Sequence, residues 1–348
     1  MATIRTGASA YLKYEYETSY GTGGTPNKKF GLQDRLTNWT LTHNRIDMPA
    51  LNQTTIKNYA YGQQSGSLSV GCVLSNPWIF ESVFGAPSTG SATSGVYPHT
   101  FGTTAGNKTM NTLVCEVGYD GDSADIVRTM RGCVVNSLGI STSIGATVDL
   151  SVDMTYGKED APSTSLGTAP SEPTEEFPYT FAHGVIKVGG NTLAQVQDLD
   201  ITFAQNPSLL YGIGSNQAVS SYRQIFDMTG RFRAALLNKN LLENVLNQIS
   251  KGSSGNYSET VGGSPELELT FQSTATSVQN EIKITGTGLA PTDLNISGVE
   301  PVEPIFEEIN WRIKSATVVA KNTQSGACLL YTSDAADDTP CLDLGGRR

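Results

Sequence analysis

Charged residues, histidine and cysteine are all scarce in this chain of 348 residues. Asp, Glu, Lys and Arg make up 16% of the sequence, whereas they make up roughly 25% of an ordinary soluble domain. The 33 acidic residues outnumber the 23 basic ones, which gives a formal net charge of −10. This balance excludes a basic nucleic-acid binder, a coiled coil and a charge-driven disordered protein.

Long apolar runs are missing as well. No stretch approaches the roughly 18–20 apolar residues that a membrane-spanning helix needs, so we expect no association with a membrane. Residues 1–7 contain no apolar signal core. We therefore expect a protein that is made in the cytoplasm and is not exported.

Residues that could hold a metal or carry out catalysis form no recognisable motif. Cys72, Cys115 and Cys133 include no CxxC pair and stand among apolar residues, which favours buried side chains over a zinc site. Asp120 and Asp122 lack the spacing of a calcium loop, and their context favours a hairpin turn. No nucleophile elbow or phosphate-binding loop occurs. We expect no cofactor, no metal and no enzymatic activity.

Alternation of apolar and polar residues dominates the chain. In each alternating segment one face is apolar and the other carries Thr, Ser, Asp or Glu, which is typical of antiparallel sheets with one face in water. The clearest segments are 36–41, 68–74, 136–141, 147–154 and 266–271. The sequence therefore predicts a mainly β fold.

Two segments favour helices. Residues 75–84 have Asn76 as an N-cap, Pro77 at the first helical position and Gly85 after the last turn. The second segment, residues 238–246, ends before a Gly/Ser run.

The surroundings of these two helices indicate a duplication. Trp39-Thr40-Leu41 aligns with Ile201-Thr202-Phe203 at the offset that aligns the helices, and Ser137–Ser141 resembles Asp293–Ser297 at a slightly shorter offset. We therefore expect two tandem antiparallel β-sandwich or barrel domains, each with one short flanking helix. The expected divisions are an N-terminal arm (1–29), a first domain (30–157), a Pro/Ser/Glu-rich linker or loop (158–178) and a second domain (179–327).

Residues 328–348 differ from the rest of the chain. Cys328–Asp337 can be back-translated to a transposase-type sequencing adapter, and Asp343–Arg348 fits the distal part of the same adapter. An ordinary polar tail is the alternative. We expect this segment to be a sequencing artefact and the true C-terminus to be missing.

Two long segments, 42–66 and 205–227, are rich in apolar and Tyr residues without a clean period. Long structureless loops are uncommon unless they are functional, and apolar ones would leave a sticky patch on a monomer. We expect them to be buried against another subunit; folding back over their own core is the alternative. The candidate interface residues are Ile46, Met48, Leu51, Ile56, Tyr59, Tyr61, Leu209, Leu210, Tyr211 and Ile213.

Three segments resemble phage tail tube proteins, the major tail proteins of long-tailed, siphovirus-like phages. They are Tyr16–Gly23 ahead of a Trp-containing strand, Leu74–Phe80 with its order of strand, Asn-Pro and helix, and Arg131–Leu138. The resemblance extends in layout over residues 1–327 and is sharpest between residues 10 and 157.

The resemblance implies a structural protein of the virion tail whose subunits form rings that stack into a tube for DNA ejection. Two tandem domains would complete a ring as a trimer with pseudo-sixfold symmetry; a hexamer with the second domain outside is the alternative. The implied partners are further copies of the chain and the tape measure, tail terminator and baseplate proteins. Genomic DNA would pass through without specific binding.

An acidic lining of such a tube would repel DNA phosphates and let DNA slide. The candidates for the lumen are Asp149, Asp153, Glu266 and Glu268, which alternate with core residues. A solvated outer face is the alternative for these four acids.

A carbohydrate-binding or adhesin-like β-sandwich protein is the other class that we consider. It would place Trp39, Trp78 or Trp311 on an exposed flat face. Trp78 opens an apolar helix and Trp39 alternates with Leu41, so both are expected in the core instead.

Overall fold

The protein is mainly β in its computed structural model, as the sequence predicts: strands make up 67% and helices 4%. The structure describes residues 10–51, 54–102, 110–120, 125–167, 177–193, 196–235, 249–251, 257–261, 266–273, 280–297 and 304–324. The predicted helix at 238–246 and the segment 328–348 lie outside these residues.

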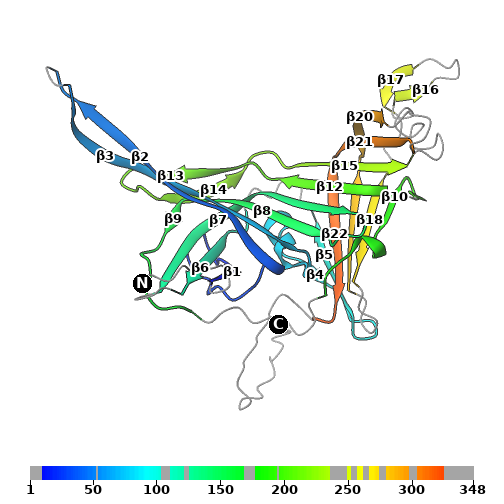
Figure 1. Cartoon of the computed structure of the whole chain (residues 1–348), viewed down its shortest axis with the longest axis horizontal. Helices are drawn as coiled ribbons and strands as arrows, with labels where there is room; N and C mark the ends of the chain where they lie inside the picture. The colour runs from blue at the N-terminus through cyan, green and yellow to red at the C-terminus, as the bar shows by residue number, and fades with distance from the viewer. Residues whose placement is uncertain are drawn as a thin grey trace, which may run out of the picture.

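A long central sheet runs through both halves of the chain (Figure 1). All its neighbouring strands are antiparallel. The order is β2 (Leu32–Pro49), β3 (Ile56–Val73), β8 (Asp149–Tyr156), β7 (Ile126–Ser143), β12 (Val196–Ala204), β15 (Asp227–Ala235), β21 (Phe306–Ile313) and β20 (Ala290–Ser297). The sheet is open. The closed barrel, one of the two architectures expected from the sequence, is therefore not formed.

Further strands pack beneath each half of the central sheet (Figure 1). Under the first half, β1 (Ala10–Tyr16) pairs with β6 (Leu113–Tyr119), and the first part of β7 pairs with β6 and with β9 (Lys158–Glu159). Under the second half lies a separate sheet. Its order is β11 (Asn191–Thr192), β10 (Val185–Val188), β18 (Leu267–Gln272), β19 (Glu281–Thr287), β22 (Ser315–Asn322), β5 (Tyr97–Gly102) and β4 (Ser88–Thr89).

Two hairpins form two-stranded sheets of their own. One consists of β13 (Pro207–Tyr211) and β14 (Ala218–Arg223), and the other of β16 (Ile249–Lys251) and β17 (Tyr257–Val261).

The predicted helix at 75–84 is shorter than expected. A 3₁₀ turn at Trp78–Phe80 leads into α1 (Glu81–Phe84). Pro77 is the N-cap residue of the 3₁₀ turn, one position later than the predicted Asn76, although the Asn76 side chain accepts a hydrogen bond from the Trp78 amide at 3.3 Å. Gly85 ends α1 with φ of 88°, as predicted. A second 3₁₀ turn covers Phe181–His183.

The alternating pattern decides which face of each strand is buried. In β8 the side chains of Leu150, Val152 and Met154 are buried, whereas Asp149 and Asp153 lie on the opposite face. The predicted strand segments fall on the observed strands β2, β3, β7, β8 and β18, and are confirmed.

The order of strands repeats within the chain. The central sheet reads β2-β3-β8-β7 and then β12-β15-β21-β20, and the strands beneath read β1-β6-β7-β9 and β10-β18-β19-β22. The two units are nevertheless joined, because β7 pairs with β12 and β5 of the first half pairs with β22 of the second. A division into two tandem domains therefore stays a prediction.

Gly230 in β15 lies directly against the ring of Trp311, which is fully buried. A Cβ at position 230 would lie 2.1 Å from Trp311 Cζ2 and 2.7 Å from the carbonyl oxygen of Asp200. We expect Gly230→Ala to lower the free energy of unfolding by about 1–3 kcal/mol, measured by urea denaturation, because the packed ring must move. Gly102→Ala is the control, since a Cβ there meets nothing within 4 Å. Equal stability of the two variants would contradict this packing.

Candidate assembly surfaces

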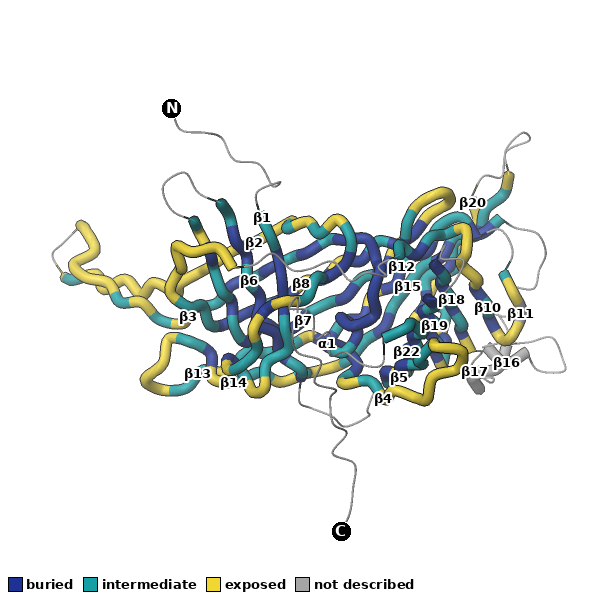
Figure 2. The backbone as a smooth tube through the Cα atoms, turned by 90° about the horizontal axis from the view of Figure 1, so that it is seen from below, coloured by how far each residue is buried: buried dark blue, intermediate teal, exposed yellow. Residues whose placement is uncertain are grey.

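The first predicted loop is a two-stranded arm. β2 and β3 are each 18 residues long and remain paired from Leu32 with Val73 out to Pro49 with Ile56. Their outer parts, here called the arm (residues 42–51 and 54–64), extend beyond the body of the protein (Figures 1 and 2). The expectation of a structureless loop was therefore wrong. The period is unclear in the sequence because both faces of the arm are exposed, so no burial enforces alternation.

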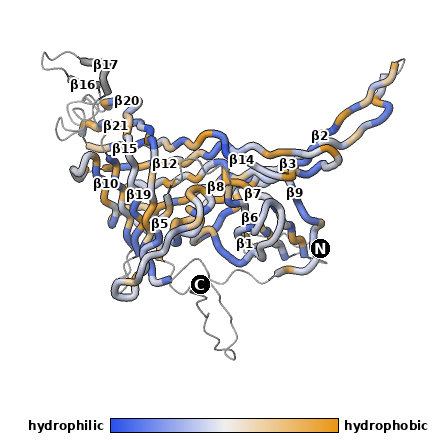
Figure 3. Tube along the Cα trace, turned by 180° about the vertical axis from the view of Figure 1, so that it is seen from behind, coloured by the Kyte–Doolittle hydropathy of each residue, from blue (hydrophilic) through white to orange (hydrophobic). Residues whose placement is uncertain are grey.

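The arm presents its apolar side chains to solvent. Ile46, Met48 and Leu51 are 46–99% exposed, and hydrophobic residues recur along the arm in Figure 3. Tyr59 lies under the guanidinium of Arg45 at 4.7 Å. The other sequence candidates on the arm, Ile56 and Tyr61, are also exposed. The register places Ile46 and Met48 on one face of the arm and Tyr59 and Tyr61 on the other. Exposed apolar side chains gathered on a projecting hairpin favour an interaction site.

The second predicted loop is also a hairpin, but it folds back over the first half of the chain. The second hairpin (residues 205–226) contains β13 and β14. The Tyr211 hydroxyl donates to the carbonyl of Gln64 at 2.8 Å, and the Gln64 amide donates to the carbonyl of Asn216 at 2.7 Å. The Ala218 amide donates to the carbonyl of Gly157 at 3.0 Å.

The sequence left open the alternative that these segments fold back over their own core. Much of the second hairpin does fold back over the same chain. Leu209 and Tyr211 are partly buried, whereas Leu210 and Ile213 remain exposed.

Two polar side chains, the buried Gln205 and the half-buried Arg223, anchor the base of the second hairpin, and sequence reasoning missed both. Gln205 donates from Nε2 to the carbonyls of Ser82 at 3.0 Å and Val135 at 3.2 Å. Arg223 donates to the carbonyl of Val83 at 2.6 Å and to Gln205 Oε1. Burial lowers the pKa of Arg223. No sequence signal identifies these residues, because their partners are backbone carbonyls of another element.

The outer face of the central sheet is polar and carries two of the four predicted lumen acids. Residues that are directly paired share one face of a sheet, and Asp149 pairs with Ser141, which pairs with Asp200. Asp153 lies on the same face and accepts a hydrogen bond from the Ser137 hydroxyl at 3.0 Å. Sequence reasoning missed Asp200 because it could not place β12 beside β7.

The other two predicted lumen acids lie elsewhere. Glu268 belongs to β18, in the sheet beneath the second half, and Glu266 directly precedes that strand. Glu268 is paired with Lys283 at 2.7 Å and with Lys187 at 2.9 Å, and hydrogen bonds from these two lysines lower its pKa. The structure therefore brings Asp149 and Asp153 together and separates Glu266 and Glu268 from them.

Arginines offset part of the acidic charge on the polar face of the second half. Arg231 contacts Asp200 at 2.6 Å and Glu308 at 3.5 Å, and the hydrogen bond that it donates to Asp200 raises the pKa of Arg231. Arg312 contacts Asp227 at 2.5 Å. The polar face thus carries balanced ion pairs in its second half.

The two open edges of the central sheet are formed by β2 and β20. Leu41 on β2 is 37% exposed and Ile296 on β20 is 42% exposed. Unpaired backbone groups at such edges are ready to pair with another strand. Sequence reasoning missed this pair of residues, because exposure at an edge depends on the order of strands in the sheet.

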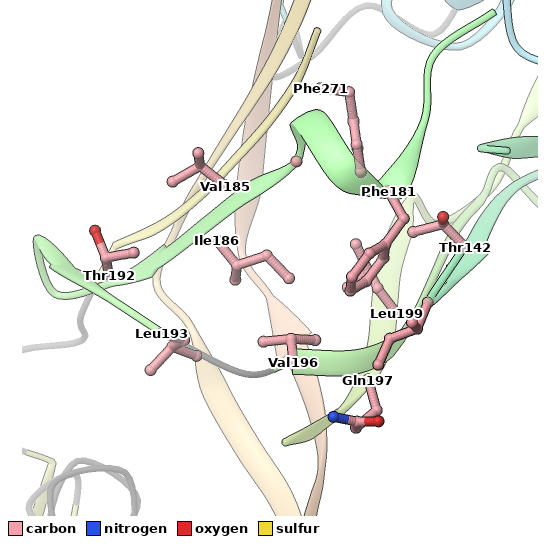
Figure 4. Close-up of a pocket in the computed structure, with 12 residues that line it drawn as sticks. Thr142, Phe181, Val185, Ile186, Thr192, Leu193, Val196, Gln197, Leu199 and Phe271 are labelled. Atoms are coloured by element: carbon pink, nitrogen blue, oxygen red, sulfur yellow. The ribbon is translucent and has the colours of Figure 1, made fainter. Parts of the chain in front are cut away.

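An apolar cavity of about 410 Å³ lies where the two halves meet. Figure 4 shows Phe181, Ile186 and Val196 facing one another across it. Thr142 and Gln197 supply polar atoms, and no ionisable side chain lines the cavity. It offers apolar contacts but no acid or base.

Histidines and metal ligands are scattered in the described ranges. His99 is buried, with Nδ1 2.9 Å from the Thr89 hydroxyl and Nε2 3.0 Å from Asn322 Oδ1. Among the residues that the structure describes, no three His, Cys, Asp or Glu side chains gather into a metal site. No helix in this part of the chain is long and apolar enough to cross a membrane.

An open antiparallel sheet with apolar residues at both edges, together with an exposed apolar arm, defines a structural β-protein suited to association through its strands. A family model described as phage tail tube protein matches residues 7–313, so the chain belongs to this family and the resemblance seen in the sequence is confirmed. The family makes it a structural component of the virion tail. No curated protein matches the chain.

Proposed function

We propose that the protein is the tail tube subunit of a long-tailed phage and that its copies polymerise into stacked rings, forming the conduit through which DNA is ejected. The observation that carries this proposal is the repeated order of strands in a sheet that is open at both ends. Such a sheet can be extended by further copies without any change in its pairing, and a ring removes the open edges.

The repeat favours a trimeric ring with pseudo-sixfold symmetry. Each chain supplies two four-stranded units side by side in one sheet, joined by β7 and β12. A hexamer with the second domain outside the ring is less well supported, because the second unit continues the same sheet. We retain residues 30–157 and 179–327 as the proposed domains. Residues 1–29 precede them as the N-terminal arm, and residues 158–178 form the linker or loop between them.

The polar face of the central sheet is the surface that we assign to the lumen. It carries Asp149 and Asp153 amid Ser and Thr side chains in its first half, and acidic groups repel DNA phosphates, whereas the charge of Asp200 in its second half is offset by Arg231. The DNA would therefore slide past without specific binding. Glu266 and Glu268 are proposed for the lumen with less support, since they belong to the other sheet.

The remaining contacts of the subunit are proposed from its place in a tail. Tape measure, tail terminator and baseplate proteins would contact the inside and the two ends of the tube. The subunit would be made in the host cytoplasm and assembled there into the virion.

The carbohydrate-binding alternative loses its support in the structure. Trp78 and Trp311 are buried. Trp39 is covered by the guanidinium of Arg128 at 3.7 Å and stacks on Tyr119 at 6.3 Å. The three tryptophans therefore provide no exposed platform for a sugar ring.

Electron microscopy of the purified full chain across concentrations tests the proposal. We expect rings or hollow filaments, and native mass spectrometry of the rings should count three copies of the 37.0 kDa chain. Six copies would favour the hexamer. A monomer at every concentration would overturn the proposed function.

A further inference from the structure

We propose that neighbouring protomers in the ring pair β20 of one copy with β2 of the next, antiparallel, with Asn295 opposite Thr40 and Leu294 opposite Leu41. The inference rests on the proposed function, in that it needs copies that associate side by side. It adds the residues and the register of that contact. The partner is a second copy of this chain.

The pairing of β7 with β12, here called the internal junction, shows how one unit joins the next. Ile140 lies opposite Ile201 and Leu138 lies opposite Phe203. All four side chains are buried, with at most 1% of each exposed. The internal junction therefore continues both the hydrogen-bonded ladder and the hydrophobic core from one unit to the other.

The strand pairings fix which residues of β2 correspond to those of β12. Ile201 pairs with Gly230 of β15 and Phe203 pairs with Met228. In the first unit Trp39 pairs with Leu68 of β3 and Leu41 pairs with Gly66. The offset in residue number that relates β2 to β12 is thus the same as the offset that relates β3 to β15, and neither alignment needs a gap.

The same reasoning relates β20 to β7. Leu138 pairs with Val152 of β8, and Leu294 pairs with Ile309 of β21. The neighbouring pairs, Ile140 with Leu150 and Ile296 with Glu307, agree with this register.

Transferring the internal junction to the open edges places Leu294 opposite Leu41 and Ile296 opposite Trp39. Leu41 and Ile296 are exposed, whereas their counterparts Phe203 and Ile140 are buried. Trp39 and Leu294 are only partly buried against the core. Pairing the two edges would cover the exposed side chains of Leu41 and Ile296. The internal junction already buries the corresponding side chains in the same way.

The polar face of the proposed contact is free of charge conflict. Asn295 would lie opposite Thr40 and Asp293 opposite Thr42, so the one carboxylate meets a hydroxyl. Like charges directly opposite each other would be destabilising. Pro291, which has no amide hydrogen, lies outside this stretch, so the amides of residues 293–296 that point away from β21 can donate to a new strand.

Both edges belong to one chain, so the contact is head-to-tail. Each protomer that adds its β2 to a neighbour leaves its own β20 open for the next copy. A head-to-tail contact closes into a ring when its rotation permits. This fits a second copy of the chain better than an unrelated partner, which would cover one edge and stop growth.

Paired cysteine substitutions test the register. We would use the full chain with Cys328 and Cys341 replaced by serine, because Cys72, Cys115 and Cys133 are buried. The matched variants are Thr40→Cys with Asn295→Cys, and Thr42→Cys with Asp293→Cys. The mismatched variants exchange the partners, Thr40→Cys with Asp293→Cys and Thr42→Cys with Asn295→Cys. All four positions are exposed, so folding should be unaffected.

Directly opposite residues bring their Cβ atoms to about 4.5–5.5 Å, close enough for a small movement of the strands to reach the roughly 3.5–4.5 Å of a disulfide, whereas diagonal ones stay about 7–8 Å apart. After mild oxidation of preformed rings we expect both matched variants to give covalent dimers and closed trimers on non-reducing gels. The mismatched variants should give at least about tenfold less, since their Cβ atoms lie beyond disulfide reach.

The outcomes separate this inference from the proposed function. Rings with preferential cross-linking of the matched pairs support both. Rings in which the mismatched pairs link as well or better, or in which no pair links, overturn the register while the tube function stands. Failure of the unsubstituted protein to form rings at any concentration overturns the proposed function and this inference with it.

Discussion

Replacing Phe203 with alanine is expected to lower the free energy of unfolding by about 3–5 kcal/mol, which is typical for removing a buried aromatic ring. Phe203 is fully buried at the internal junction. Its ring contacts Phe84 at 5.2 Å and Phe80 at 6.4 Å between centroids. The side chain therefore ties α1 of the first half to β12 of the second, and its loss leaves a cavity between them.

Urea denaturation followed by tryptophan fluorescence would measure this loss at a concentration where the protein is monomeric. Ile213→Ala is the control, because Ile213 is fully exposed on the second hairpin and should change the free energy by no more than about 0.5 kcal/mol. A Phe203→Ala variant as stable as this control would show that the two halves do not depend on a shared core.

Removing the apolar side chains of the arm is expected to abolish tube formation while leaving rings intact. We would combine Ile46→Ser, Met48→Ser, Ile56→Ser and Tyr59→Ser. These side chains are about half exposed in the single chain, so their replacement removes little burial from the folded subunit. Contact between rings, by contrast, would lose most of its apolar area if the arm provides it. Electron microscopy should show single rings at concentrations where the unsubstituted protein gives filaments.

A matched variant controls for the general loss of surface apolar groups. Ile144→Ser with Ile126→Ser removes exposed apolar side chains outside the arm, and we expect it to form filaments normally. Filaments of unchanged length from the arm variant would show that the arm takes no part in stacking. Loss of rings as well as filaments would assign the arm to the contact within the ring instead.

The two predictions test different levels of one arrangement. Phe203 and its neighbours hold two units together within a chain, whereas the outer part of the arm leaves its apolar side chains exposed in the single chain and its base at Gln64 is bonded to the second hairpin. The second hairpin shows an intermediate case, since Tyr211 and Ala218 bond to the first half while Ile213 stays exposed. The structure thus contains one hairpin that packs largely on its own chain and one whose apolar side chains stay exposed.

Sequence patterns predicted the strands well where one face is buried. β8 alternates Leu150, Val152 and Met154 with polar residues, and such alternation requires no knowledge of the neighbouring strands. The helix at α1 was predicted from Asn76, Pro77 and Gly85, because capping is a local interaction. The repeated order of strands was visible in part for the same reason, since the corresponding strands keep similar apolar positions.

Patterns failed where both faces of a strand are exposed or where the partner is remote. The arm was read as a loop because neither face is buried, so Ile46 and Tyr59 follow no period. Glu268 was grouped with Asp149 because each alternates with core residues, but alternation does not reveal which sheet a strand joins. Gln205 and Arg223 carry no signal at all, because they bond to carbonyls that only folding brings near.

The sequence by itself determined that the protein is mainly β and acidic, because composition, alternation and capping act over a few residues. The resemblance of three of its segments to tail tube proteins was confirmed by the family model. Only the tertiary structure decided that the two units share one sheet, that β2 and β20 form its open edges, and that Leu41 and Ile296 are left exposed there. The physical reason is that strand order depends on hydrogen bonds between segments far apart in the chain, such as β7 with β12 and β5 with β22. Local preferences do not specify these partners.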